Sequence, residues 1–326
     1  QDKKGTFTIQ SPENYSGLYF PLAGDGGLKS SITPNLGGDS KTDQNHFLLE
    51  PVSIENLHNN RNTRNFWCRI ENKGSWSVCG SSAKQEAAKF TKDQDESILE
   101  AGFMWQKLTR ISKEYEMKAE TTSFVTIDGT MEVMMTELTN TADQEQKITP
   151  IAAIPVYGRS ADNIRDHRHV TSLLHRIETK TYGVEVCPVL SFDERGHQKN
   201  QTAYFVYGST GEGEAPEKFY PTTEMFIGEG GSYLNPEAVR INKDGVPAGT
   251  KLQGKEAAGG MRFASITLKP QETVTYLVLA GVSEEKKKIE NQTSAYRTKK
   301  QVEEAFKAVR KHWTDKVNVD FSTGDT

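Results

Sequence analysis

Apolar and polar residues alternate at every second position along much of this chain, and this pattern limits the fold more than any other feature. In residues 114–120, charged side chains alternate with Tyr115, Met117 and Ala119, as a strand with one buried and one solvated face requires. Six further runs are rich in β-branched and aromatic residues between turn-forming residues: 131–138, 148–156, 173–178, 203–207, 263–268 and 274–282. Many short strands at such spacing indicate an all-β fold, an antiparallel sandwich or barrel.

Turn-forming residues separate the expected strands. Asp128-Gly129 lies between two apolar runs and predicts a tight hairpin, and Lys269-Pro270-Gln271 predicts a turn between two more. Residues 208–260 contain much glycine and few long apolar runs, so we expect extended loops that lie over the sandwich. The segment nevertheless carries more aromatic residues than a disordered one, namely Phe219, Tyr220, Phe226 and Tyr233.

The pattern changes to a helical one after Ser283. Within residues 296–317, apolar residues recur at i, i+4, i+7 and i+11 and form one stripe of a helix: Val302, Phe306, Val309 and Trp313. The stripe needs a surface to pack against, and residues 319–326 add no further element. We therefore expect a β-sandwich domain in residues 1–283 and a helical linker in 284–326 that leads towards a second domain.

Charge and composition disfavour several classes of protein. The 40 Lys and Arg residues nearly balance the 44 Asp and Glu residues, with a net charge of −4 and no basic stripe, so we expect no nucleic-acid partner. No apolar stretch approaches the roughly 20 residues of a membrane span, so we expect no membrane contact.

The cysteines bear on the cellular compartment. The 3 cysteines, Cys68, Cys79 and Cys187, include no Cys-x-x-Cys pair, which favours free buried thiols and a cytoplasmic protein. A bridge between Cys68 and Cys79 across a hairpin is the alternative. The chain begins at Gln1 without Met, so a removed signal peptide would leave no trace.

The densest polar cluster lies in residues 157–169, between two expected strands. Arginine makes planar, bidentate contacts with hydroxyl pairs, carboxylates or phosphate, and loops on a rigid sheet often carry binding residues. We take five residues as the candidate substrate-binding set: Arg165, Asp166, His167, Arg168 and His169. The alternative is a solvated turn whose charges satisfy one another.

Metal binding and catalysis have weaker support in the sequence. His167 and His169 would project to one side of an extended backbone, with His175 as the nearest third ligand, but ordinary hydrogen-bonding histidines fit as well. Asp193-Glu194 sits beside Gly196 as in a turn, and residues 24–28 fit a loop better than a dinucleotide site. We therefore expect no metal, no cofactor and no catalytic residue in this chain.

Aromatic residues beside amides and arginines mark a second polar run, which extends from Leu48 to Trp67. Phe66 and Trp67 could pack on the apolar face of a sugar ring while polar neighbours take its hydroxyl groups. Alternatively, the same two residues begin a core strand that continues through Cys68 and Ile70.

The order of these elements resembles the front part of the glycoside phosphorylases of glycoside hydrolase family 94, and in particular the 1,2-β-oligoglucan phosphorylases. The resemblance covers nearly the whole chain and rests on seven short motifs: 17–22 (GLYFPL), 31–34 (SITP), 47–51 (FLLEP), 64–67 (RNFW), 76–78 (WSV), 137–141 (ELTNT) and 268–270 (LKP). It implies a supersandwich of the galactose-mutarotase type. It also implies that the terminal helix connects this domain to an (α/α)6 barrel absent from the chain.

The resemblance also implies a function. In that family, inorganic phosphate is the co-substrate: it attacks the anomeric carbon with inversion, while an Asp of the barrel protonates the glycosidic oxygen. Family members are typically homodimers in which the sandwich helps to close the active site, and a sandwich loop bears a substrate-contacting arginine. Arg165 or Arg168 would correspond to that arginine, while His167-Arg168-His169 departs from the cellobiose phosphorylase pattern.

We therefore expect a carbohydrate-binding and dimerisation domain of a phosphorylase that acts on β-gluco-oligosaccharides and releases α-glucose 1-phosphate. Its partners would be the oligosaccharide, its own catalytic barrel and a second copy. Two alternatives remain at this point, because sandwich folds host several functions. One is a mutarotase-like epimerase that uses His and Glu as acid and base, and the other is a stand-alone glycan-binding or structural module.

Overall fold

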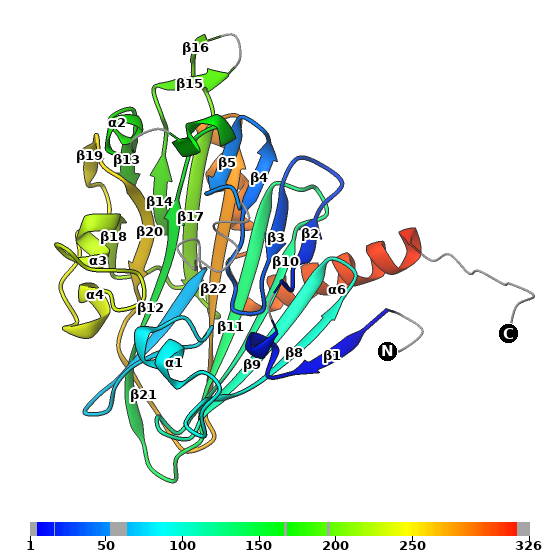
Figure 1. Cartoon of the computed structure of the whole chain (residues 1–326), viewed down its shortest axis with the longest axis vertical. Helices are drawn as coiled ribbons and strands as arrows, with labels where there is room; N and C mark the ends of the chain where they lie inside the picture. Colours follow the sequence, from blue (N-terminus) through cyan, green and yellow to red (C-terminus); the bar gives the residue numbers. More distant parts are fainter. Residues whose placement is uncertain (1–4, 16, 53–63, 166–167, 194–195, 318–326) are drawn as a thin grey trace, which may run out of the picture.

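A computed structural model of the chain describes residues 5–15, 17–52, 64–165, 168–193 and 196–317. In these ranges the strands form layered antiparallel sheets, and one long helix lies along the outside (Figure 1). This arrangement confirms the predicted all-β antiparallel supersandwich.

The largest sheet contains ten strands, and its central strands come from distant parts of the sequence. The late strand β22 (Thr273–Ser283) pairs with β11 (Met131–Asn140) on one side and with β17 (Ala203–Thr210) on the other. The other strands of this sheet are β1 (Phe7–Gln10), β8 (Glu96–Gly102), β9 (Trp105–Ser112), β10 (Met117–Val125), β14 (Gly183–Val186), β13 (Arg176–Thr179) and β19 (Lys251–Gln253).

Two smaller sheets and a hairpin complete the β structure. The six-stranded sheet contains β18 (Lys218–Thr222), β20 (Ala257–Arg262), β12 (Gln146–Val156), β6 (Asn65–Ile70), β7 (Gly74–Ser77) and β21 (Ile266–Leu268). The four-stranded sheet contains β2 (Phe20–Ala23), β3 (Lys29–Ile32), β4 (Ser40–Asp43) and β5 (His46–Leu49). The separate hairpin pairs β15 (Leu190–Asp193) with β16 (Gly196–Lys199).

Helices are short except for the last. The α-helices are α1 (Ala83–Ala88), α2 (Arg168–Ser172), α3 (Thr223–Ile227), α4 (Glu237–Arg240), α5 (Ile289–Ser294) and α6 (Lys299–Lys316). The described residues also contain the 3-10 turns η1 (Pro12–Asn14), η3 (Ala161–Arg165) and η4 (Lys286–Lys288). None of the helices in the described ranges has the length and apolar character needed to cross a membrane.

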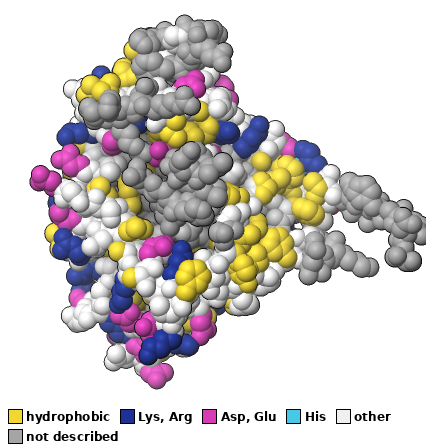
Figure 2. Space-filling model, in the orientation of Figure 1, with side chains coloured by type: hydrophobic (Ala, Val, Ile, Leu, Met, Phe, Trp, Pro, Cys, Tyr) yellow, Lys and Arg dark blue, Asp and Glu magenta, His cyan; other side chains and the backbone are white. Residues whose placement is uncertain are grey.

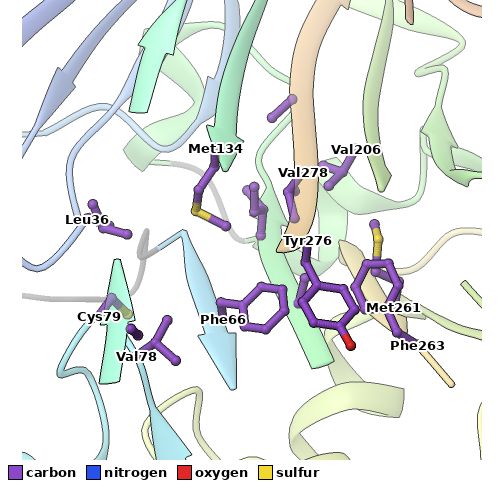
Figure 3. Packing of buried hydrophobic residues seen from close by; sticks show 14 of the residues in the cluster. Leu36, Phe66, Val78, Cys79, Met134, Val206, Met261, Phe263, Tyr276 and Val278 are labelled. Carbon is purple, nitrogen blue, oxygen red and sulfur yellow. The ribbon is translucent and has the colours of Figure 1, made fainter. Parts of the chain in front are cut away.

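The main hydrophobic core lies between the ten-stranded sheet and the two smaller sheets. Phe66 of β6 reaches across to Tyr276 of β22, with ring centroids 5.5 Å apart, and Tyr276 in turn lies 4.8 Å from Phe263 (Figure 3). Cys68 and Cys79 are buried free thiols and Cys187 is a half-buried one. The free-thiol prediction is therefore confirmed, although Cys187 is not fully buried.

The outer face of the ten-stranded sheet is buried as well. Alternate residues of β22 face opposite ways, so that Tyr276 and Val278 enter the main core while Leu277 and Leu279 contact the C-terminal helices. Burial on both faces explains why residues 203–207 of β17 and 276–282 of β22 are almost continuously apolar.

Helix α6 covers this outer face with the predicted apolar stripe. Val302 and Val309 are fully buried, and Phe306 lies 5.5 Å from the Trp105 ring and 5.3 Å from the Phe124 ring. Thr298 begins the helix with a capping box, in which its side chain and that of Gln301 satisfy each other's backbone N–H groups. The apolar stripe of α6 therefore packs on the ten-stranded sheet of the same chain.

The glycine-rich residues 24–28 form a loop, as predicted, and lie against the β10–β11 hairpin. The Asp25 N–H donates to the Ile127 carbonyl at 2.7 Å, and a Cβ atom at Gly129 would lie 1.5 Å from the Gly26 carbonyl oxygen. Gly129 also has a φ of 66°, so both close approach and backbone conformation require glycine in the predicted Asp128-Gly129 turn.

Several predicted boundaries were wrong. Residues 114–120 are not one strand: residues 113–116 form the turn between β9 and β10, with Glu116 at a φ of 51°, and the strand begins at Met117. The alternation continued through this turn because Tyr115 is buried. Similarly, β13 begins only at Arg176, and β21 only at Ile266. The turn at Pro270 joins β21 to β22, which belong to different sheets.

Residues 208–260 are more ordered than the predicted loops. They contain the end of β17, β18, α3, α4, β19 and most of β20. Tyr220 and Phe226 join Ala238 and Val239 in a small core on the outer face of the six-stranded sheet, against Trp67. The segment thus forms a second cover over the sandwich, with its own apolar contacts.

Candidate functional site

The polar segment of residues 157–175 connects β12 to β13 and begins at a fixed position on β5. The Tyr157 N–H donates to the Leu48 carbonyl at 2.7 Å, and the Phe47 N–H donates to the Arg159 carbonyl at 2.9 Å. The backbone then forms η3, passes residues outside the described ranges and forms α2. The rigid sheet therefore positions the first part of this segment.

The five predicted binding residues lie together in sequence at the junction of η3 and α2. Arg165 ends η3, and Arg168 and His169 begin α2, whereas Asp166 and His167 lie outside the described residues. The side chains of all five fall outside what the structure describes. Their binding role therefore stays a prediction.

The proposed metal site gains no support from the backbone. His169 lies in a helix, so the extended conformation that would turn His167 and His169 to one side is absent at this residue. Within the described ranges, no group of three or more His, Cys, Asp or Glu side chains could hold a metal ion. His175, the third candidate ligand, is instead a buried residue whose ring lies beside a backbone carbonyl group.

His175 is fully buried beneath the polar segment. Its Nδ1 lies 3.3 Å from the Lys255 carbonyl oxygen. Burial and the nearby Arg159 guanidinium lower the pKa of His175 to about 3, so the ring is neutral at physiological pH. A neutral, inaccessible imidazole is a structural group and cannot protonate a sugar.

Arg159 is the buried charge that the sequence did not single out. Its side chain is only 4% exposed, makes an ion pair of 2.7 Å with Glu256 and lies 5.0 Å from the centre of the Tyr157 ring. Its Nε and Nη1 atoms have no hydrogen-bond partner among the described residues. Glu256 lies 97 residues away in the sequence, so no local pattern could have identified the pair.

A small cavity of about 10 Å³ adjoins Arg159, His175 and Asn163. A cavity of this size can hold about one water molecule, which would suit the unpaired nitrogen atoms of Arg159 and the unpaired Nε2 of His175. The cavity is far too small for a sugar ring.

The second polar run has a structural role in the described part. Phe66 and Trp67 lie in β6 and are 0% and 2% exposed, so they form the core strand of the second interpretation and do not face a sugar.

Asp193 ends β15 and pairs with Gly196 of β16, which confirms the predicted turn, while Glu194 lies outside the described residues.

Several solved structures are similar to this chain in shape. One is a bacterial glucoamylase in complex with acarbose, with a TM-score of 0.47, 7% identity, and coverage of 95% of this chain and 40% of that one. Another is described as a putative kojibiose phosphorylase from the human microbiome, with a TM-score of 0.40, 8% identity and coverage of 91% and 35%. A third is described as a putative aldose 1-epimerase of Escherichia coli K12, with a TM-score of 0.40, 10% identity and coverage of 82% and 99%.

The chain spans less than half the length of the first two of these proteins. No curated protein matches its sequence. Residues 24–299, however, match the family described as "Glycosyl hydrolase 94, supersandwich domain". The match runs from the glycine-rich loop before β3 to the first residue of α6, so it includes all the described strands except β1 and β2. The chain therefore belongs to the family of glycosyl hydrolase 94 supersandwich domains.

Proposed function

We propose that this chain is the noncatalytic, carbohydrate-binding and dimerising domain of a glycoside phosphorylase that acts on β-gluco-oligosaccharides. The observation that carries the proposal is the family match over residues 24–299. A 1,2-β-oligoglucan phosphorylase is the specific parent that we favour. The parent would work in the cytoplasm, where the three free thiols stay reduced.

The reaction that we propose for the parent needs a second domain. Inorganic phosphate attacks the anomeric carbon of a β-linked glucose, an acid of the catalytic barrel protonates the departing glycosidic oxygen, and inversion gives α-glucose 1-phosphate. In this scheme helix α6 leads from the sandwich to the barrel. Its firm packing on the ten-stranded sheet supports this role, because a connector held along its length fixes the direction of the chain that follows.

The sandwich would contribute polar contacts to the sugar or phosphate. In this proposal Arg165 and Arg168 hold hydroxyl groups or phosphate, Asp166 orients them, and His167 and His169 add hydrogen bonds. The anchoring of residues 157–159 to β5 supports this arrangement, because it holds the start of the segment in place. The barrel and a second copy of the chain would complete the site.

A phosphorolysis assay on the longer gene product tests this function. The protein is incubated with phosphate and with β-1,2-, β-1,3- or β-1,4-linked gluco-oligosaccharides, and release of glucose 1-phosphate is measured. We expect release with one linkage class, the β-1,2-linked one for the parent that we favour. Absence of sugar phosphate with all three would refute the proposal.

The binding segment needs a test of its own. We expect the double substitution Arg165→Ala and Arg168→Ala to raise the KM for oligosaccharide or phosphate about tenfold or more, because a charged hydrogen bond is worth about 1.5–3 kcal/mol. Arg240→Ala, at an exposed position on α4, is the matched control and should leave KM unchanged. Equal KM values for both variants would contradict the assignment of the segment.

The mutarotase alternative cannot use His175. Such an enzyme needs an accessible acid and base beside the sugar, whereas His175 is fully buried and its pKa is lowered to about 3. Mutarotation of α-glucose by the 326-residue chain above the buffer rate would favour that alternative.

A further inference from the structure

A surface cleft lies far from the polar segment of residues 157–175. It has a volume of about 380 Å³ and lies between η1, the residues before β2 and the end of α1. Helices α1 and α2 lie towards opposite ends of the long axis of the molecule (Figure 1). Apolar side chains gather beside acidic and basic ones on this lower part of the surface (Figure 2).

Exposed aromatic rings distinguish this cleft from the other surface hollows. Tyr15 is 59% exposed and Phe90 is 73% exposed, which makes them the most exposed large aromatic side chains of the described residues, and both line the cleft together with Tyr19. Large apolar groups that gather on one surface generally indicate a binding site. Their convergence here therefore points to a ligand with apolar faces.

Hydrogen bonds hold the chain segments that carry the two exposed rings, without a ligand. Phe90 has a φ of 62°, a conformation that is rare for a bulky residue, and its N–H donates to Oε1 of Gln94 at 2.8 Å. The Nε2 atom of Gln94 donates to both Glu13 and Asn14 at 3.0 Å. One amide thus connects the loop that carries Phe90 to the turn that precedes Tyr15, and a preorganised site loses less entropy on binding.

The charges of the cleft favour a neutral ligand. Burial opposes ionisation of Glu13, but the Arg110 guanidinium and hydrogen bonds from Ser97 and Gln94 outweigh it and hold the pKa of Glu13 below its usual value. Lys89 makes an ion pair of 3.2 Å with Glu86. The charges of the cleft are therefore largely compensated within it, and a phosphate or a nucleic acid would find no excess of positive charge.

We propose that this cleft is a second glycan-binding site, which takes the pyranose rings of a β-linked gluco-oligosaccharide. All substituents of β-glucopyranose are equatorial, so both faces of the ring present axial C–H groups to Tyr15 and Phe90, while its hydroxyl groups reach Asn14 and the other polar groups of the cleft. The choice of a β-gluco-oligosaccharide rests on the proposed function, whereas the site itself is separate, because none of its residues belongs to the polar segment of residues 157–175.

Calorimetric titration of the 326-residue chain tests the proposal. The probes are cellopentaose, laminaripentaose and a β-1,2-linked glucopentaose, with a β-1,4-linked galactopentaose for comparison because its axial O4, which carries the linkage, interrupts one face of each ring. We expect saturable binding of at least one glucan and weaker binding of the galactan. Absence of glucan binding, or equal affinity for the galactan, would overturn the assignment.

Matched variants locate the binding. Tyr15→Ala and Phe90→Ala should each weaken affinity about five- to tenfold, the effect of losing one aromatic face, whereas Phe90→Trp should retain it. Ile241→Ala, at a 53% exposed position elsewhere, is the control, and thermal unfolding verifies that each variant folds. If only the Arg165→Ala and Arg168→Ala variant loses binding, the cleft proposal fails while the proposed function stands.

Discussion

Replacing Glu132 of β11 with Gln tests whether a buried ion pair joins Arg64, the residue before β6, to the ten-stranded sheet. The Arg64 side chain is 0% exposed and that of Glu132 is 3% exposed, with Arg64 Nε 2.5 Å from the carboxylate. The same guanidinium donates to carbonyl groups of the β3–β4 connection, including Gly37 at 3.1 Å and Asp39 at 3.0 Å. Ser30 of β3 donates to Glu132 at 2.6 Å. The substitution therefore leaves a buried cation without its counter-charge.

The expected cost is large. Removing one partner of a buried ion pair destabilises a protein by about 3–5 kcal/mol, which is a large share of the roughly 5–15 kcal/mol that stabilises a typical domain. The double variant Arg64→Met and Glu132→Leu should lose less than the sum of its single changes, because the two residues are in direct contact. Lys113→Met breaks an ion pair with Glu96 whose side chains are 83% and 59% exposed, and it should cost less than about 1 kcal/mol.

Urea unfolding followed by circular dichroism measures these differences, with the m-value checked for constancy across the variants. The reasoning is refuted if Glu132→Gln lowers the free energy of unfolding by no more than Lys113→Met does. It is also refuted if the single changes at Arg64 and Glu132 prove additive, because the two side chains would then be energetically independent.

Three further predictions follow from buried groups. Because burial and Arg159 lower the pKa of His175 to about 3, the unfolded chain binds a proton that the folded chain excludes, so stability falls as pH drops below about 6.5. Between pH 7 and pH 5, the free energy of unfolding of the native chain should fall by about 2 kcal/mol more than that of His175→Gln, as measured by urea unfolding. Phe306→Ala should cost about 2–3 kcal/mol in the same assay, below the value for a fully buried ring, because half-buried Phe306 loses its contact with Trp105; Phe306→Leu should cost less. Burial raises the pKa of all three thiols, so a thiol reagent at pH 8 should modify half-buried Cys187 alone in the native chain and all three cysteines in urea; reaction of a second native thiol would contradict the packing.

The sequence predicted most accurately the elements that have one face exposed to solvent. Helix α6 has its stripe at Val302, Phe306, Val309 and Trp313 because its other side meets solvent, and the prediction was confirmed. The turn at 113–116 was missed because buried Tyr115 continues the alternation through it. Local periodicity cannot separate a strand from a turn whose one apolar side chain reaches the core.

Long-range contacts account for the other differences. The aromatics of residues 208–260 pack against Trp67 and Ile151 from distant strands, and no local pattern reveals such partners. For the same reason the sequence did not single out Arg159 within the polar cluster, because its ion pair with Glu256 spans 97 residues. The sequence did identify the polar segment as a unit, and its Arg165, Asp166, His167, Arg168 and His169 remain predicted contacts.

The central place of β22 has a consequence for biosynthesis. This strand joins β11 to β17, yet it leaves the ribosome after all the other strands of the sandwich. Until then the nascent chain carries two half-sheets, each with an open edge that could pair with another polypeptide. We therefore expect chains that stop before Thr273 to aggregate, because their halves lack the strand that unites them.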